Sequence, residues 1–373
     1  MRVKMQKLLK NFMLALDTQP HASIVHSLAA SPALGDFLDD LDPNLSLDWS
    51  AESFQGLPSL REKVLARMGY APACHADDVL ITAGAAEANF LSIMRLLNPG
   101  DELIVDWPTW PQPIALGQAL HATIKKLPRR EENDWNFDID ECADLITGKT
   151  KLIFICNPNN PTGHLLDQND LNKIANLAER VGAYVLTDEV YRGLEWNGSS
   201  TPCLANLYHR GISTGSVSKA LGLQGLRVGW LVCRNADFIK DAMVLRENSS
   251  EIMNILGETI AEIALGESRY QQMIQRAQQQ GRQNLEILEQ FITDTPQLSW
   301  RRPLAGLIGL CRLDLPFDGD ELFARLINFP YHTFIMPGSA YGFPQHVRLG
   351  VGGGPEAKLQ QGLQQLKKLL DTI

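Results

Sequence analysis

The stretch Gly215-Ser-Val-Ser-Lys219-Ala-Leu-Gly-Leu-Gln-Gly-Leu-Arg227-Val-Gly-Trp230 decides the fold. It continues a short apolar run that predicts a buried strand, and its lysine stands among apolar and glycine residues. Burial lowers the pKa of a lysine and so favours the uncharged, nucleophilic amine. Ser216 and Ser218 offer hydroxyls and Arg227 a forked donor, a combination that suits a phosphate. Taken alone, the stretch also fits a surface lysine with a structural arginine nearby, so the rest of the chain must decide.

Around this stretch the chain alternates short apolar runs with amphipathic ones. The apolar runs predict buried strands at Val79–Thr82, Glu102–Val105, Lys151–Cys156, Ala183–Thr187, Gly211–Gly215 and Gly229–Cys233. Helical patterns lie between them, as at Leu60–Met68, Ala86–Leu97, Asp167–Arg180 and Ala236–Leu245. This alternation predicts an α/β fold with a mainly parallel sheet between helices. Ligands of such sheets bind at the carboxyl ends of the strands, so residues that follow a strand are the candidates for chemistry.

The pattern changes near residue 267. A long Gln-rich helix is predicted at Arg269–Phe291, then a strand pair within Leu298–Leu313, a helix at Gly319–Asn328, strands at Thr333–Met336 and His346–Val351, and a final helix. We therefore expect a large domain (48–267), a smaller α+β domain (268–373), and an N-terminal arm (1–47) that packs with the smaller domain.

Residues suited to hold a flat aromatic ring follow three of the predicted strands. Asp188 follows the strand at 183–187 and suits a buried pyridinium nitrogen, and Tyr191 can reach a phenolic oxygen of the ring. The turn Asn157-Pro-Asn-Asn160-Pro-Thr-Gly163 is rigid and directs the Asn160 amide toward the same place. Trp110 follows the strand at 102–105 and can stack on the ring.

Two further elements suit anionic groups. Gly84, Ala85 and Ala86 stand between a strand and a helix, where small residues let backbone N–H groups at the helix N-terminus bind a phosphate. Arg348, on the last predicted strand, suits a carboxylate held by two hydrogen bonds. Each element alone is more often structural, but their joint occurrence in this order predicts one cofactor site.

Together these motifs resemble fold-type I pyridoxal 5′-phosphate (PLP) enzymes of the aminotransferase class I/II family over almost the whole chain. The resemblance implies that Lys219 holds PLP as a Schiff base and later moves the Cα proton of a free α-amino acid, through an external aldimine and a quinonoid. It implies that Asp188 keeps the pyridine nitrogen protonated, which makes the ring an electron sink. It further implies a homodimer with sites at the interface, a substrate carboxylate bound by Arg348 beside Asn160, and cofactor contacts from Gly84, Ala85, Ala86, Trp110, Asn160, Tyr191, Ser216, Ser218 and Arg227.

Three positions depart from the family pattern. The family commonly has a tyrosine five residues before the glycine that is Gly56 here, and it reaches the phosphate of the partner subunit; this chain has Ala51, with Trp49 as a candidate substitute. His26 stands in an arm segment expected to line the substrate pocket, where plain aminotransferases have an acid, and His164 follows the Asn-Pro-Thr-Gly turn. The changes resemble the branch of the family that contains capreomycidine synthase.

Two reactions therefore stay open. The sequence slightly favours dehydration and cyclisation of a hydroxylated arginine to a cyclic guanidino amino acid (capreomycidine or enduracididine type), with His26 or His164 assisting departure of the hydroxyl. The alternative is an ordinary α-amino-acid aminotransferase that uses a 2-oxo acid. A PLP-binding regulator without catalysis is disfavoured, because the arm is too short for a DNA-binding domain and the chain is acidic.

Composition argues against several partners. The net charge is −9, with an isoelectric point near 5.4, which disfavours nucleic acid and anionic membranes. No apolar run approaches the roughly 20 residues of a membrane span, and the basic N-terminus predicts a helix, not a signal peptide. The cysteines, six in all, lack zinc spacing, so we expect reduced thiols, no metal and a cytoplasmic protein.

Overall fold

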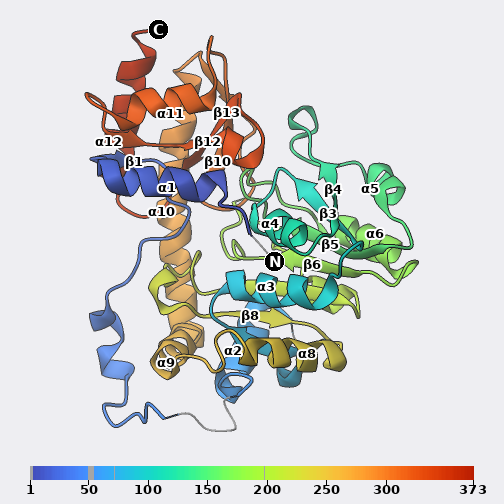
Figure 1. Cartoon of the computed structure of the whole chain (residues 1–373). Helices are drawn as coiled ribbons and strands as arrows, with labels where there is room; N and C mark the ends of the chain where they lie inside the picture. The colour runs from blue at the N-terminus through green and yellow to red at the C-terminus, as the bar shows by residue number, and fades with distance from the viewer. Residues whose placement is uncertain (1–2, 49–53, 71, 197) are drawn as a thin grey trace.

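A seven-stranded sheet lies at the centre of the computed structural model, which describes residues 3–48, 54–70, 72–196 and 198–373 (Figure 1). The strand order is β2-β8-β7-β6-β5-β3-β4, with bounds β2 (Val79–Thr82), β3 (Glu102–Trp107), β4 (Thr123–Pro128), β5 (Thr150–Cys156), β6 (Tyr184–Asp188), β7 (Gly211–Ser216) and β8 (Gly229–Val232). β8 runs antiparallel to β7 and β2, and the other four pairings are parallel. The predicted α/β fold with a mainly parallel sheet is confirmed.

Helices cover both faces of this sheet because its central strands are apolar on both sides. Leu152 and Phe154 of β5 pack in one cluster with side chains of α3 (Ala85–Leu96), α4 (Gln112–Ala119) and α8 (Ala236–Glu247). Ile153 and Ile155 point the other way, as the period of two requires, and pack with α5 (Ile139–Leu145) and α6 (Gln168–Glu179). A third cluster joins β2 and β8 to α2 (Pro58–Met68) and α9 (Ile255–Ala264).

Two strands of this sheet differ from the sequence-based expectation. The apolar run of β8 resembles those of the parallel strands although β8 runs antiparallel to its neighbours, because burial on both faces gives the same composition in either direction. β4 was not predicted, because Lys125 and Lys126 interrupt its apolar pattern; it is an edge strand, and only Leu127 in it is buried.

The C-terminal part has its own antiparallel sheet, in the order β12-β13-β10-β9. Its elements are α10 (Glu267–Thr293), β9 (Leu298–Trp300), β10 (Ile308–Leu313), α11 (Gly319–Ile327), β11 (Thr333–Phe334), β12 (Met336–Pro337), β13 (His346–Gly350) and α12 (Glu356–Leu370). The single strand predicted at Thr333–Met336 is wrong, since β11 and β12 belong to different sheets. A short helix, α7 (Leu204–Leu207), and 3-10 helices at Leu34–Asp40, Ala76–Asp78, Glu131–Asn133, Gln224–Leu226 and Gly338–Tyr341 complete the description.

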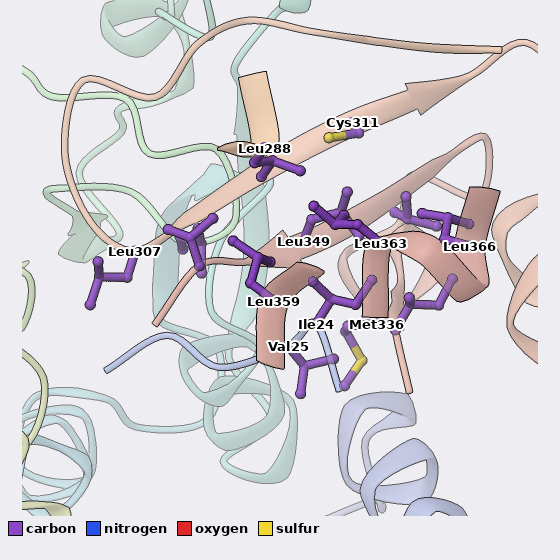
Figure 2. Close-up of a cluster of buried hydrophobic side chains, with 14 of the residues drawn as sticks. Ile24, Val25, Leu288, Leu307, Cys311, Met336, Leu349, Leu359, Leu363 and Leu366 are labelled. Carbon is purple, nitrogen blue, oxygen red and sulfur yellow. The ribbon is translucent and has the colours of Figure 1, made fainter. Parts of the chain in front are cut away.

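The N-terminal arm packs on these C-terminal elements. After α1 (Lys7–Thr18), the strand β1 (Ala22–Ser23) pairs in parallel with β11. Figure 2 shows Ile24 and Val25 of the arm among Leu359 and Leu363 of α12, in one buried apolar cluster. The arm thereby reaches from the C-terminal sheet toward the centre of the molecule. The domain boundaries at 47/48 and 267/268 stay predictions.

Candidate active site

A cavity of about 220 Å³ lies where the parallel strands end. Ten of the predicted site residues line it, namely Ala85, Ala86, Trp110, Asn160, Asp188, Tyr191, Ser216, Ser218, Lys219 and Arg227. Asn89 and Gln224 also line it and were not predicted. Arg227 precedes β8 instead of following a strand, but the antiparallel direction of β8 brings its first residue to the same edge of the sheet.

Lys219 presents its amine to this cavity. Burial lowers the pKa of Lys219 to about 8, the positive charges of Arg348 and Arg227 act in the same direction, and Asp188 opposes them. The amine donates a hydrogen bond to the hydroxyl of Ser27, with 3.2 Å between Nζ and Oγ. More of the amine is therefore uncharged near neutral pH than in an ordinary lysine, as imine formation requires.

Asp188 is the buried acid of the cavity, with 5% of its surface exposed. Burial raises the pKa of Asp188 to about 6, against hydrogen bonds from Asn89 and from the Val190 amide that favour the carboxylate. Asn89 Nδ2 donates to Asp188 Oδ2 at 2.8 Å, and Thr214 Oγ1 donates to Asn89 Oδ1 at 2.9 Å. Asn89 lies within α3, so a search for residues that follow strands does not find it. The sequence signal for it is a polar residue on the buried face of a helix.

Loss of the Asn89 amide is expected to reduce turnover by about 10- to 100-fold, because hydrogen bonds to a charged group contribute ~1.5–3 kcal/mol. In Asn89→Ala, Asp188 loses its 2.8 Å donor and the pKa of its carboxyl rises. Steady-state kinetics test this, with Ser92→Ala as the matched control, because the Ser92 hydroxyl in the same helix donates to the Ala88 carbonyl instead. Equal turnover in Asn89→Ala and Ser92→Ala would show that Asn89 only packs.

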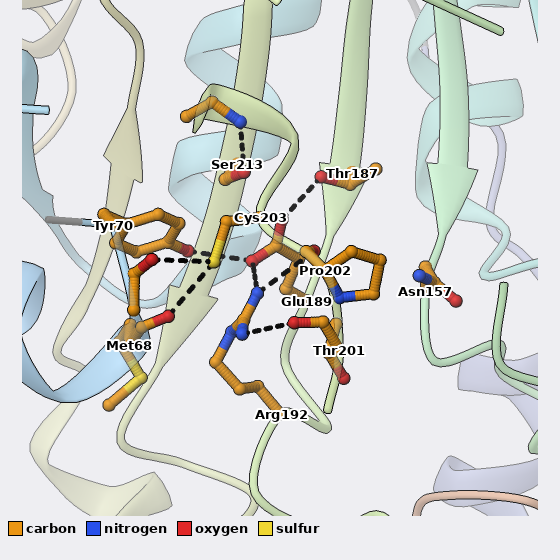
Figure 3. A network of polar contacts seen from close by, with 12 residues as sticks. Met68, Tyr70, Asn157, Thr187, Glu189, Arg192, Thr201, Pro202, Cys203 and Ser213 are labelled. Atoms are coloured by element: carbon orange, nitrogen blue, oxygen red, sulfur yellow. Dashed lines mark hydrogen bonds and ion pairs between the residues drawn. The ribbon is translucent and has the colours of Figure 1, made fainter. Parts of the chain in front are cut away.

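A network next to the cavity fixes the segment that carries Asp188 (Figure 3). Glu189 is buried, and its carboxylate accepts hydrogen bonds from Tyr70 Oη at 2.9 Å and from Arg192 Nη2 at 2.6 Å. Thr187 Oγ1 donates to the other carboxylate oxygen of Glu189 at 2.7 Å. These contacts anchor the chain directly after β6, so the residues on either side of Glu189 are held in place.

The Gly84 turn forms a tight cradle beside Arg227. Gly84 has φ +82°, and a Cβ there would collide with the Arg227 guanidinium. A Cβ at Gly229 would come within 2.6 Å of the Ala85 nitrogen. The N–H groups in the first turn of a helix lack helical partners, so α3 begins with donors beside Arg227, Ser216 and Ser218. This donor set fits the phosphate of PLP.

Arg348 borders the cavity through Asn160. Its Nη1 donates to Asn160 Oδ1 at 3.2 Å and its Nη2 to the Val25 carbonyl at 2.9 Å. Only 3% of the residue is exposed, its Nε is buried without a hydrogen-bond partner, and within the described ranges no carboxylate pairs with it. A buried guanidinium of this kind is prepared for an external carboxylate.

The two predicted histidines do not line the cavity. Because the arm is extended, Ser27 faces Lys219 while His26 turns to a second cavity beside Lys358. His164 Nδ1 is 2.9 Å from the Asp134 carbonyl oxygen, and burial lowers the pKa of His164 to about 3. Neither position suits a general acid for this cavity. Ala51 and Trp49 lie outside the described residues.

Two wider properties concern binding partners. Among the described residues, no group of three or more His, Cys, Asp or Glu suits a metal ion. Nor does any helix within the described ranges have the length and apolar character needed to cross a membrane.

Comparison with known proteins gives one family. The model of the family "Aminotransferase class I and II" matches residues 51–366. Aspartate aminotransferase of Musicola paradisiaca is 29% identical over 201 residues, 52% of this chain and only 50% of that enzyme. Capreomycidine synthase of Streptomyces vinaceus is 27% identical over 84% of this chain and 79% of its own. A PLP-dependent aminotransferase structure from Streptococcus suis superposes with a TM-score of 0.91 and 25% identity, covering 100% of this chain and 99% of that one.

Proposed function

Because the chain belongs to the aminotransferase class I and II family of PLP-dependent enzymes, we propose that it transfers the amino group of an α-amino acid to a 2-oxo acid. The observation that carries the proposal is the buried Arg348 guanidinium, which lacks a carboxylate partner among the described residues and lies near the Lys219 amine. An α-amino acid and a 2-oxo acid share the carboxylate that such a guanidinium binds. Aspartate aminotransferases from several organisms among the relatives support the same reaction.

The residues of the cavity fit PLP. Lys219 would hold it covalently, Asp188 would pair with the pyridine nitrogen, and Asn160 and Tyr191 would bind the phenolic oxygen. Ser216, Ser218, Arg227 and the first turn of α3 would hold the phosphate, and Trp110 would cover the ring. When bound, the cofactor supplies an electron sink that makes the Cα–H bond of an amino acid acidic.

The protein residues would then orient the substrate and move a proton. Arg348 binds the substrate carboxylate and so fixes the Cα–H bond relative to the Lys219 amine. Because the pKa of Lys219 is lowered to about 8, its Nζ can accept the Cα proton and donate it again in the same turnover. Asp188 contributes a buried negative charge, held by Asn89, that would stabilise positive charge on the pyridine nitrogen.

Cyclisation of a hydroxylated arginine is the second candidate, and the match to capreomycidine synthase over 84% of this chain supports it. The sequence-based preference for this reaction rested on His26, His164 and the absence of the usual tyrosine at Ala51. His26 turns to another cavity and His164 is bonded to the Asp134 carbonyl, so neither histidine is near enough to assist departure of a hydroxyl in the cavity of Lys219. The aminotransferase is therefore the better-supported proposal.

The two reactions differ in what they consume. We propose incubating the purified, PLP-loaded protein with a panel of amino acids that includes hydroxyarginines, with and without a 2-oxo acid, followed by mass analysis. The aminotransferase proposal predicts nitrogen transfer that requires the oxo acid. Loss of water without loss of nitrogen, in the absence of an oxo acid, would establish the cyclase instead.

The histidines are expected to be dispensable for chemistry. In His26→Gln and in His164→Gln, turnover is expected to stay within about threefold of the parent, since neither side chain reaches the cavity. The measurement is steady-state kinetics together with exchange of the α-proton for deuterium. A variant that keeps α-exchange but loses elimination of water by roughly 10²–10⁴, the range for a general acid, would revive the cyclase.

We also propose a homodimer with sites at the subunit interface, as the family resemblance implies, and a cytoplasmic location, which the scattered cysteines favour. Exposed apolar side chains on α1, including Leu9, Met13 and Leu16, support an interface between chains. Sedimentation of the purified protein tests it, with a monomeric, fully active species as the contradicting result.

A further inference from the structure

Ser27 is a buried hydroxyl in the N-terminal arm, with 7% of its surface exposed. Its Oγ accepts a hydrogen bond from Lys219 Nζ at 3.2 Å, and its hydroxyl is also hydrogen-bonded to the phenol of Tyr191. Ser27 thus stands between the Lys219 amine and the Tyr191 phenol. The sequence motifs did not indicate it, because it follows no strand of the large sheet.

The backbone on both sides of Ser27 is fixed to the site itself. Two residues before it, the Val25 carbonyl accepts a hydrogen bond from Arg348 Nη2 at 2.9 Å. Two residues after it, the Ala29 amide donates to the carbonyl oxygen of Lys219 at 2.8 Å. The arm is therefore tied to the carboxylate-binding arginine and to the reactive lysine, and the hydroxyl between these ties has little freedom to turn away.

We propose that Ser27 is a positioning residue whose hydroxyl holds the free Lys219 amine in place and links it to the Tyr191 phenol. The amine donates to Ser27 Oγ, and the Ser27 hydroxyl donates to Tyr191 Oη. This arrangement stabilises the protonated amine, because a hydrogen-bond acceptor at Nζ favours the charged form. The inference rests on the proposed function only through the role of Lys219, and it holds whether the enzyme transfers nitrogen or cyclises.

The charged groups around Lys219 shift its pKa in both directions. Asp188 on β6 favours the protonated amine, whereas Arg348 on β13, Arg227 before β8, and burial favour the neutral amine. Tyr191 is a further titratable neighbour, with Lys219 Nζ 5.9 Å from its ring centroid. Removing the Ser27 hydroxyl removes a hydrogen bond that stabilises the protonated amine, so the pKa of Lys219 is expected to fall.

The test is the reactivity of Lys219 in the full-length, cofactor-free chain. The protein is pulse-labelled with acetic anhydride across the pH range, and modification of the peptide that contains Lys219 is measured by mass spectrometry. Only the neutral amine reacts, so the midpoint of labelling reports the pKa. In Ser27→Ala this midpoint is expected to fall by about one pH unit, the effect of losing one hydrogen bond to a charged group.

Controls separate the hydroxyl from packing. Ser27→Thr keeps the hydroxyl and is expected to keep the parent midpoint, and Ser31→Ala, in the same arm, is expected to do the same. Ser27→Cys has a side chain of similar volume that hydrogen-bonds weakly, so its labelling midpoint should fall as in Ser27→Ala. It replaces Ser27→Ala if circular dichroism shows the alanine variant to be unfolded. An unchanged midpoint in the folded Ala or Cys variant would overturn the proposal. Because labelling needs neither PLP nor substrate, this result is independent of which reaction the enzyme catalyses.

Discussion

Replacing Lys219 by alanine is expected to lower amino transfer by at least about 10⁴-fold, because one side chain supplies both the nucleophile that binds the cofactor and the base that moves the Cα proton. No other lysine lines the cavity among the described residues, so a substitute amine is not at hand. The measurement is the initial rate with an amino acid and a 2-oxo acid at saturating PLP.

Lys358→Ala is the matched control, since this lysine borders the second cavity beside His26. It is expected to keep normal turnover. If Lys219→Ala, folded by circular dichroism, kept more than about 1% of parental turnover, the base and nucleophile would have to lie elsewhere.

Asp188→Ala is expected to cost roughly 10²–10³ in turnover, the usual effect of removing one electrostatic group from an active site. Its carboxylate is buried in the cavity that the Lys219 amine also lines, and burial makes its charge act strongly over short distances. Lys219 should still bind PLP in this variant, so its absorbance and borohydride reduction are expected to persist. Normal turnover of Asp188→Ala, with its absorbance and borohydride reduction unchanged, would show that Asp188 has a structural role only.

The residues at strand ends were predictable because topology alone brings them together. Parallel strands end at one edge of a sheet, so Asp188 at the end of β6 and Lys219 after β7 had to be neighbours once the alternation of strands and helices was recognised. The apolar runs of β5 and β6 are long enough to fix that alternation. The same logic placed Asn160 and Trp110 at the cavity.

The unpredicted residues reach the cavity by tertiary packing. Asn89 reaches it from the buried face of a helix, and Ser27 from an arm almost 200 positions away in sequence. The arm around His26 is extended, so neighbouring side chains point to opposite sides. An error of one residue therefore exchanges the inward and outward faces. The arm segment contacts Lys219, but it does so through Ser27, the residue after His26.

Borohydride reduction of the PLP-loaded protein, followed by peptide mass mapping, tests whether this cavity binds PLP through the amine of Lys219. We expect one reduced pyridoxyl phosphate group per chain, on the peptide that contains Lys219, and none in Lys219→Ala. The same amount of adduct in Lys219→Ala, or an adduct on a different lysine in the parent protein, would contradict it.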